Sequence, residues 1–225
     1  MKHIFFAMLI SAGLFSCNDA SDSQENQTGD TTMTDATGGS DNSTTQTPQG
    51  IDTTNMTFKS AMQMNMDQMK GMQSTGNADN DFAALMKAHH TGGLLMAQLE
   101  LGRGKDEQMK QMARKMIEDQ QKDIAELDRF ASGHAPHGGG SESFYNTVMN
   151  HMKNMQLDVD QSVSADKQFV QAMIKHHQGG IDMATAYLRS DGHAEQLKTL
   201  ANNMIGKHQK EVQEMQAWLQ KNGGQ

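Results

Sequence analysis

The sequence predicts an all-α protein: a ferritin-like helical bundle built from an internally duplicated helical unit and preceded by a disordered tether. Three observations predict it. Two similar segments with helical period recur 87 residues apart. The chain has only 5% aromatic residues and two prolines, which argues against an all-β sandwich or barrel. Its 21 methionines favour helices and form an unusually large supply of soft ligand atoms.

The N-terminus has the features of an export signal, predicted over residues 1–16. Lys2 precedes an apolar run over residues 4–14, which is too short to span a membrane. The following Leu-Phe-Ser-Cys resembles a bacterial lipobox, and it implies that Cys17 becomes the lipidated first residue of the mature protein. An ordinary secretory signal followed by a stray cysteine is the alternative. We therefore expect a membrane-anchored lipoprotein, exported to the periplasm or to the cell surface.

Residues 17–55 are predicted to be a disordered, acidic tether. They contain seven acidic residues and no Lys or Arg, and most of the rest are small or polar. The remaining residues, 56–225, contain 18 basic and 20 acidic side chains, so this part is nearly neutral. A net charge of -8 argues against nucleic-acid binding. The single cysteine excludes an intramolecular disulfide and Cys-rich zinc or iron–sulfur sites.

An internal repeat organises the rest of the chain. FAALMKAHHTGGLLMA at residues 82–97 matches FVQAMIKHHQGGIDMA at residues 169–184 in its Phe, Met, His-His, Gly-Gly and Met-Ala positions. The repeat units are predicted at residues 56–130 and 144–222, joined by a Gly-rich crossover at residues 131–143. Each unit is expected to contain a short Met-rich helix, a His-His helix and a third helix.

Capping residues indicate where these helices begin and end. Asp79 or Asp81 is expected to cap the first His-His helix, and Ser164 or Asp166 the second. The third helices are predicted to begin near Asp106 and His193 and to end at the glycines near residues 133 and 223.

The His-His pairs lie on the apolar stripe of the central helices. A buried imidazole without a partner costs roughly 1–3 kcal/mol, so each pair requires a metal ion, a carboxylate or a carbonyl. The Gly-Gly pair that follows costs about 1 kcal/mol per glycine in a helix, which indicates close helix approach or space for an ion. Gln120 stands where the second unit has His208, so two non-identical sites are plausible. The candidate metal ligands are Met86, His89, His90, Met96, Met116, Met173, His176, His177, Met183, Met204 and His208.

The mixture of thioether and imidazole favours copper, as Cu(I) with Ag(I) as its mimic, over Zn(II) or Mg(II). An additional soft-ligand cluster is predicted in the first helix of each unit, from Met62, Met66, Met69, Met149, His151 and Met152. A methionine stripe is also an ordinary core filler, and for Met109 and Met112 this interpretation is equally good. His134 and His137 give only a weak Cu(II) signal, and His193 is expected at the surface.

The pattern M-x-x-HH-x-GG-x-x-MA occurs twice, each time followed by a helix that ends in Q-K-[DE]-[IV]-x-E-[LM]. It resembles the family catalogued as domain of unknown function 305, over about residues 56–222. The resemblance implies a ferritin-like bundle and an exported metal-binding protein in copper or silver resistance, with ligands among the Met and His residues of the two motifs. Gly93 and Gly180 stand where that family usually has Ala.

Two other classes of function compete with metal binding. Ferritin-like bundles often house di-iron oxidoreductases, which use inward Glu residues and a Glu-x-x-His motif. The sequence contains no Glu-x-x-His, and Met stands three residues before His89 and His176. We therefore expect no enzymatic activity. The alternative is a metal-dependent oxidoreductase such as a copper oxidase, which would need an open coordination position and a substrate pocket. The third possibility is a structural helical module of the cell envelope, without bound metal.

Replacing Cys17 with Ser is expected to release the protein from the membrane fraction. The acidic tether offers no apolar face or basic patch for a membrane, so the lipid would be its only anchor. Fractionation of cells that express the variant measures this release. A variant that stays with the membrane would contradict the lipoprotein interpretation.

Overall fold

The computed structural model describes residues 53–134 and 142–222, and over these ranges it is helical without strands, which confirms the predicted all-α class. None of these helices is long and apolar enough to cross a membrane. The predicted signal at 1–16, Cys17, nearly all of the tether and the middle of the crossover lie outside the described residues. The helices are α1 Phe58–Lys70, α2 Ala78–Arg103, α3 Glu107–Gly133, α4 Ser143–Asn154, α5 Ala165–Leu188 and α6 Glu195–Asn222.

Short polar side chains cap the helix starts, mostly where the sequence predicts. Ser164 Oγ accepts from the backbone N–H of Lys167 at the start of α5, as expected. Asp106 caps α3 in the same way. The expected cap of α2 was wrong, because Asn77 and not Asp79 or Asp81 accepts from the first turn. Both aspartates lie inside that turn, where their carboxylates bind other segments.

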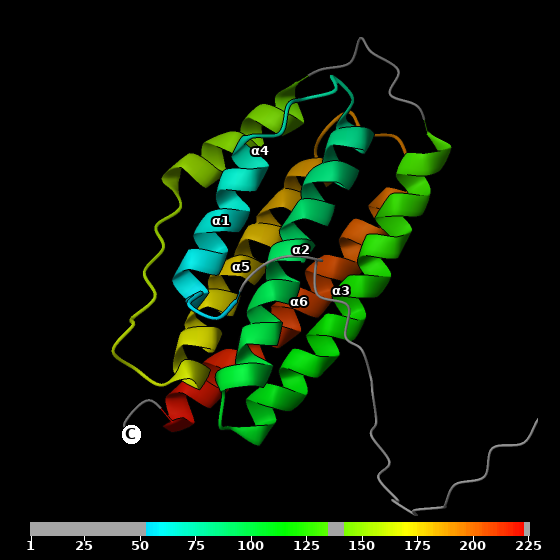
Figure 1. Ribbon diagram of the computed structural model, residues 1–225. Helices are drawn as coiled ribbons and strands as arrows, with labels where there is room; N and C mark the ends of the chain where they lie inside the picture. The colour runs from blue at the N-terminus through cyan, green and yellow to red at the C-terminus, as the bar shows by residue number, and fades with distance from the viewer. Residues whose placement is uncertain (1–52, 135–141, 223–225) are drawn as a thin grey trace, which may run out of the picture. The chain divides into compact units, whose positions relative to one another are not determined.

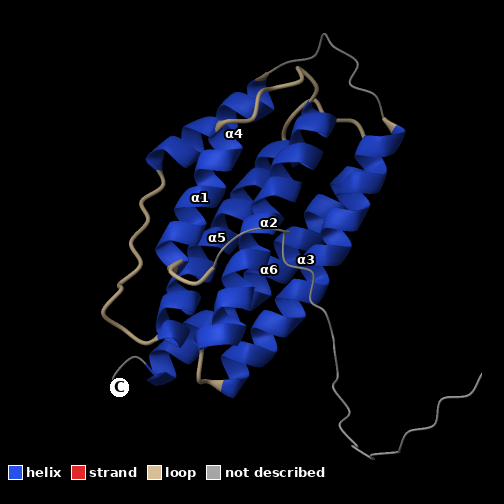
Figure 2. Ribbon diagram, viewed as in Figure 1, coloured by secondary structure: helices blue, strands red, loops and turns tan. Residues whose placement is uncertain are grey.

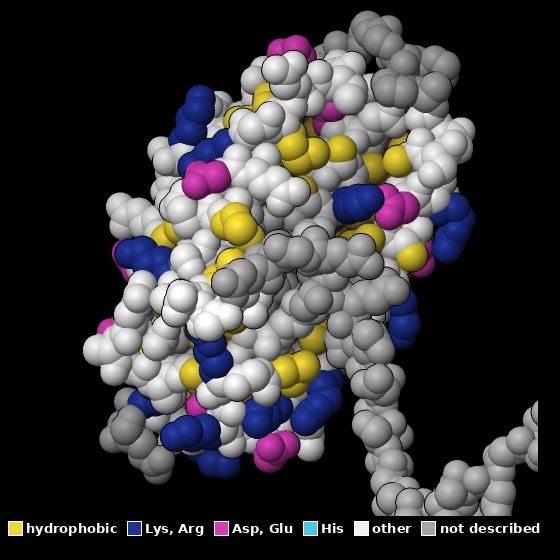
Figure 3. Space-filling view, in the orientation of Figure 1, with side chains coloured by type: hydrophobic (Ala, Val, Ile, Leu, Met, Phe, Trp, Pro, Cys, Tyr) yellow, Lys and Arg dark blue, Asp and Glu magenta, His cyan; other side chains and the backbone are white. Residues whose placement is uncertain are grey.

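The helices form three layers, with α2 and α5 as the central pair (Figures 1 and 2). α1 and α4 pack on one side of this pair, and α3 and α6 pack on α2 and α5 at the other side. α2 and α5 run in opposite directions, so the start of each lies near the end of the other. On the face shown in Figure 3, basic and acidic side chains are interspersed, with hydrophobic side chains visible between polar ones.

Two apolar cores fill the bundle. The first core contains Phe82 and Met86 from α2 and Tyr187 from α5, and the second contains Met96 from α2 and Phe169 from α5. Along both central helices the paired histidines and glycines come between the residues of one core and those of the other. A polar layer therefore divides the hydrophobic interior at its middle.

The two repeat units complete each other at their ends. The carboxylate of Asp166 in α5 accepts the backbone N–H groups of Lys105 at 2.7 Å and Asp106 at 2.8 Å, between α2 and α3. At the matching place, Asp79 in α2 accepts the N–H of Ala194 at 3.3 Å, just before α6. Each loop thus needs a carboxylate from the other unit, because an unpaired N–H that is shielded from water is costly.

A fragment of residues 56–130 is expected to fold poorly or to dimerise. Alone it exposes the apolar face of α2 that packs on α5, and its α2–α3 loop loses the carboxylate of Asp166. Analytical ultracentrifugation and urea unfolding of the fragment, beside residues 56–222, measure this. A monomer of the fragment that unfolds cooperatively would contradict mutual dependence of the two units.

Candidate metal centre

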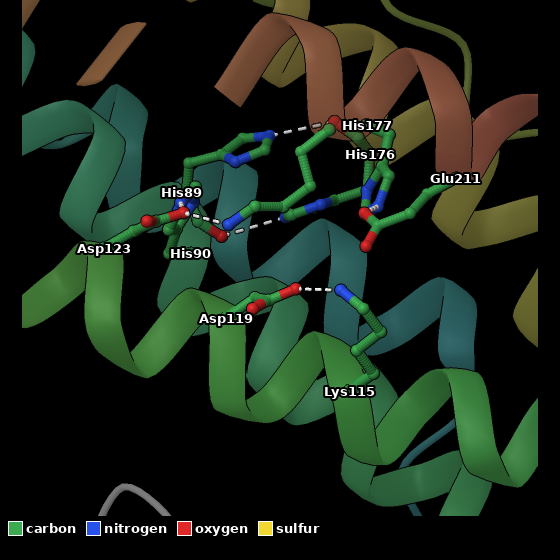
Figure 4. Close-up of polar contacts among 9 residues, drawn as sticks. His89, His90, Lys115, Asp119, Asp123, His176, His177 and Glu211 are labelled. Carbon is green, nitrogen blue, oxygen red and sulfur yellow. Dashed lines mark hydrogen bonds and ion pairs between the residues drawn. The ribbon is translucent and has the colours of Figure 1, made fainter. Parts of the chain in front are cut away.

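The centre of the bundle is a stacked pair of imidazoles, His89 from α2 and His176 from α5, with ring centroids 3.7 Å apart. Each ring reaches the backbone of the opposite helix. His89 Nε2 donates to the carbonyl oxygen of His176 at 3.0 Å, and His176 Nε2 donates to that of His89 at 2.9 Å. Figure 4 shows these reciprocal contacts. They join the two repeat units at equivalent positions and fix the Nε2–H tautomer of both rings.

Glycines in the central helices make this approach possible. A Cβ at Gly93 would lie 2.8 Å from His176 Cε1, and a Cβ at Gly180 would lie 3.0 Å from His89 Cε1. At Gly93 a real Cβ does not approach that closely, and it would also lie 2.3 Å from Gln120 Oε1, so an alanine there would displace these side chains. At Gly180 an alanine would require the ring of His89 to shift slightly. The sequence left two interpretations of these mid-helix glycines, close helix approach and space for an ion. The structure favours close approach, because side chains occupy the space beside the glycines.

The second histidine of each pair faces the layer of α3 and α6 and bonds a carboxylate there. His90 Nε2 lies 3.3 Å from Asp123 Oδ2 of α3, and His177 Nε2 lies 2.7 Å from Glu211 Oε2 of α6. His208 of α6 stacks on His177 with a centroid distance of 4.3 Å. Figure 4 shows the two carboxylates on opposite sides of the histidines. Neither Asp123 nor Glu211 is among the candidate ligands that the sequence predicts.

The five histidines at the centre are buried, and burial disfavours the charged form of four of them. Burial lowers the pKa of His176 to about 3, and repulsion from His177 adds to this effect. Burial also lowers the pKa values of His89 and His208, again with contributions from neighbouring imidazoles. Burial lowers the pKa of His90 as well, although its bond to Asp123 acts the other way. A neutral imidazole is the form that binds metal ions.

Each of these rings keeps one nitrogen without a partner. Within the described part of the chain, no hydrogen bond reaches Nδ1 of any of the five, and each of these atoms is shielded from water. A buried polar atom without a partner is costly and requires an explanation such as a bound ion. The layer therefore holds lone pairs that protein groups leave unused. The rings concerned are His89, His90, His176, His177 and His208.

The predicted methionine ligands separate into the two cores. Met86, Met183 and Met204 belong to the first core. Met96, Met116 and Met173 belong to the second core, together with Met109. All are buried. Met173 and Met204 thus lie in different cores, although both belong to the second repeat unit.

A cavity of about 380 Å³ lies among α1, α4 and α5, and it gathers most of the predicted soft-ligand cluster. His89 and His176 also line it, so the cavity borders the histidine layer. His151, Asn154 and Gln178 are exposed lining residues at its edge. Met149 is buried in the first core and does not line the cavity. Six methionines line it: Met62, Met66, Met69, Met152, Met155 and Met183.

One polar contact of α1 has no counterpart in α4 within the described part of the chain. Asn65 is buried and its Nδ2 donates to the carbonyl oxygen of Ala88 at 2.7 Å, which holds α1 closely against α2. The side chain occupies the place where a Cβ of Gly92 would be, 2.2 Å from Asn65 Cγ. His151 stands at the equivalent position of α4 and is exposed. Asn65 also lines the cavity, next to the methionines of α1.

Two other histidines lie away from this layer. His193 is exposed beside the start of α6, as predicted. His134 is exposed at the end of α3, where its ring stacks on Phe130. His137 lies outside the described residues. The described part therefore gives no support to a pair of loop ligands.

Acid is expected to destabilise the metal-free protein. A histidine in the unfolded chain has a pKa of about 6.5, whereas that of His176 in the fold is about 3. As the pH falls between these values, the unfolded state binds a proton that the folded state excludes. The free energy of unfolding should fall by up to about 1.4 kcal/mol per pH unit for each such histidine. Urea unfolding between about pH 7 and pH 5 measures this slope.

Two variants test the origin of this pH dependence of the free energy of unfolding. Burial and the nearby Asp166 raise the pKa of Glu100 to about 8, so this group favours the fold below the pKa of an unfolded glutamate and loses that effect as the pH rises through about 8. Glu100→Gln should therefore steepen the loss of stability in acid, and replacement of the exposed His193 by Gln should leave it unchanged. A flat pH profile would contradict a neutral histidine layer.

Comparison with known proteins places this arrangement in a family. No curated protein sequence matches the chain. CopM in its Cu(II)-bound form is 25% identical over 64% of this chain and 96% of its own, with a TM-score of 0.51. CopM in an Ag-bound form is 23% identical with the same coverage and a TM-score of 0.50. A DUF305 protein from Streptomyces coelicolor is 21% identical over 67% of this chain and 96% of its own, with a TM-score of 0.54. Residues 16–131 and 132–219 each match the family described as Domain of unknown function (DUF305), and the chain therefore belongs to the DUF305 family.

Proposed function

We propose that this protein is an exported, lipid-anchored copper carrier or buffer, which binds Cu(I), and Ag(I) as its mimic, through methionine and histidine side chains. The assignment is metal binding without a catalytic step. Its role is to keep copper from reacting outside the cytoplasm or to pass it to another protein.

The methionine-lined cavity is the observation that carries this proposal. Thioether sulfur is a soft, neutral ligand that prefers Cu(I), whereas Zn(II) and Mg(II) prefer harder donors. The cavity combines six such side chains with the rings of His89, His151 and His176. Outside the cytoplasm a thiolate site would be prone to oxidation, and the only cysteine of the chain lies in the lipobox-like segment.

The position of the cavity suggests how a metal ion reaches the interior. Exposed His151 and Gln178 stand at its edge, and buried Met62, Met66 and Met183 line its deeper part. An ion can therefore exchange water for one ligand at a time. Because methionine side chains are flexible and carry no charge, they adjust around the ion without a large cost in desolvation.

CopM supports copper as the metal. Its Cu(II)-bound form is 25% identical to this chain over 64% of the chain and has a similar fold. We infer that this chain likewise takes copper, and the choice of Cu(I) rests on the sulfur atoms of the cavity. The fold by itself would not distinguish a metal carrier from a structural module.

Replacing Met66 and Met152 with Leu is expected to weaken Cu(I) and Ag(I) binding by at least about tenfold and to preserve the fold. Leu and Met have similar volumes and helix propensities, so mainly the sulfur atoms are lost from the cavity. Competition of the purified protein against a Cu(I) chelator measures the dissociation constant.

The double variant Met109→Leu/Met215→Leu is the matched control. Both residues are fully buried in the second core and line no part of the cavity, so Cu(I) binding should stay at the parental value. Parental affinity in the Met66→Leu/Met152→Leu variant would show that the cavity methionines are packing residues.

A further inference from the structure

Three side chains on the far side of the histidine layer form a cluster without sulfur. One ligand atom each from His177, His208 and Glu211 lies within 4.8 Å of the other two. All three residues are buried. None of them lines the methionine cavity, which lies on the side of α1 and α4. The cluster therefore needs a chemical interpretation separate from that of the soft ligands.

Buried atoms without a partner point to a ligand at this cluster. Nδ1 of His177 and Nδ1 of His208 are both shielded from water, and neither has a hydrogen-bond partner in the described ranges. Gly180 leaves room for the second ring, since a Cβ there would lie 3.0 Å from His208 Nδ1. His177 Nε2 is bonded to Glu211, so the nitrogen of His177 without a partner is Nδ1. The two imidazoles and the carboxylate are thus held together at the cost of burying them.

The first repeat unit provides an internal comparison, because the equivalent place has lost these features. Gln120 stands where the second unit has His208, and Asp123 stands where it has Glu211. The ammonium of Lys207 lies 3.3 Å from Asp123 Oδ2 and supplies a positive charge of its own. In the second unit Glu211 bonds His177 at 2.7 Å instead, and the nearby Lys115 forms its ion pair with Asp119. A cation is therefore expected at the second place and not at the first.

The donor set indicates which cations fit. Two imidazole nitrogens and one carboxylate oxygen suit divalent ions of intermediate softness, and three protein ligands leave a position for water. Thioether-preferring Cu(I) and Ag(I) gain nothing from a carboxylate. Among divalent ions, affinity for such donors is highest for Cu(II) and high for Zn(II).

We propose that His177, His208 and Glu211 form a second metal site, which binds one divalent cation such as Zn(II) or Cu(II) and is distinct from the methionine cavity. The protein would then accept copper in both oxidation states at two different places. The two sites share no residue, so either assignment can fail without the other.

Titration of the purified full chain with Zn(II), in competition with a chromophoric chelator, tests the site. One equivalent of Zn(II) is expected to bind tightly, and His208→Gln should raise its dissociation constant at least about tenfold. This variant copies the residue that the same bundle already holds at Gln120, so it should fold. Glu211→Gln is the second variant, and it should also weaken Zn(II) binding with little change of shape. Circular dichroism and urea unfolding verify the fold of each.

Two further variants distinguish this site from the cavity. Met66→Leu/Met152→Leu should keep the Zn(II) affinity while it loses Ag(I) affinity, and His208→Gln should do the reverse. Gln120→His with Lys207→Met should add a second equivalent of Zn(II), because it gives the first unit the donors of the second. Zn(II) binding at parental strength in folded His208→Gln and Glu211→Gln would overturn the proposal. A folded Gln120→His/Lys207→Met variant without a second equivalent would overturn the account of the first unit.

Discussion

The close approach of α2 and α5 at Gly93 and Gly180 is the constraint on which the rest of the structure depends. Because these residues have no side chain, the rings of His89 and His176 stack at 3.7 Å and bond each other's backbone carbonyls. This crossing orders the histidine layer, brings the second histidine of each pair to the carboxylates of α3 and α6, and leaves α1 and α4 to close the other side. A Cβ at Gly93 would displace the ring of His176, and a Cβ at Gly180 would require the ring of His89 to shift slightly.

The buried histidine layer lowers the stability of the fold. A bundle of this size gains most from a continuous apolar core, yet the two cores here are separated by five buried imidazoles with unused nitrogen atoms. Leu at these positions would pack without unsatisfied polar atoms. The two proposed sites give a physical reason for four of these rings, those of His89, His176, His177 and His208.

The two repeat units show how a symmetrical frame acquires different chemistry. The loops after α2 and α5 are held by equivalent aspartates, Asp166 and Asp79, so the frame itself has stayed alike. Single substitutions then distinguish the halves. Asn65 binds α1 tightly to α2, whereas His151 leaves α4 without such an anchor. Gln120 and Lys207 fill the place that corresponds to the cluster around His208.

The sequence by itself determined the helical class, the repeat and the helix boundaries to within a few residues, and it predicted the types of candidate ligand. These follow from local rules, since periodicity, capping residues and glycines act within one or two turns of the chain. It also placed Met62, Met66 and His151 in one soft-ligand cluster. Only the tertiary structure decided that Met173 and Met204 lie in different cores, that His89 stacks on His176 and that Glu211 joins His177. Those contacts join helices far apart in the sequence, and their geometry depends on the crossing of α2 and α5, which no local pattern encodes.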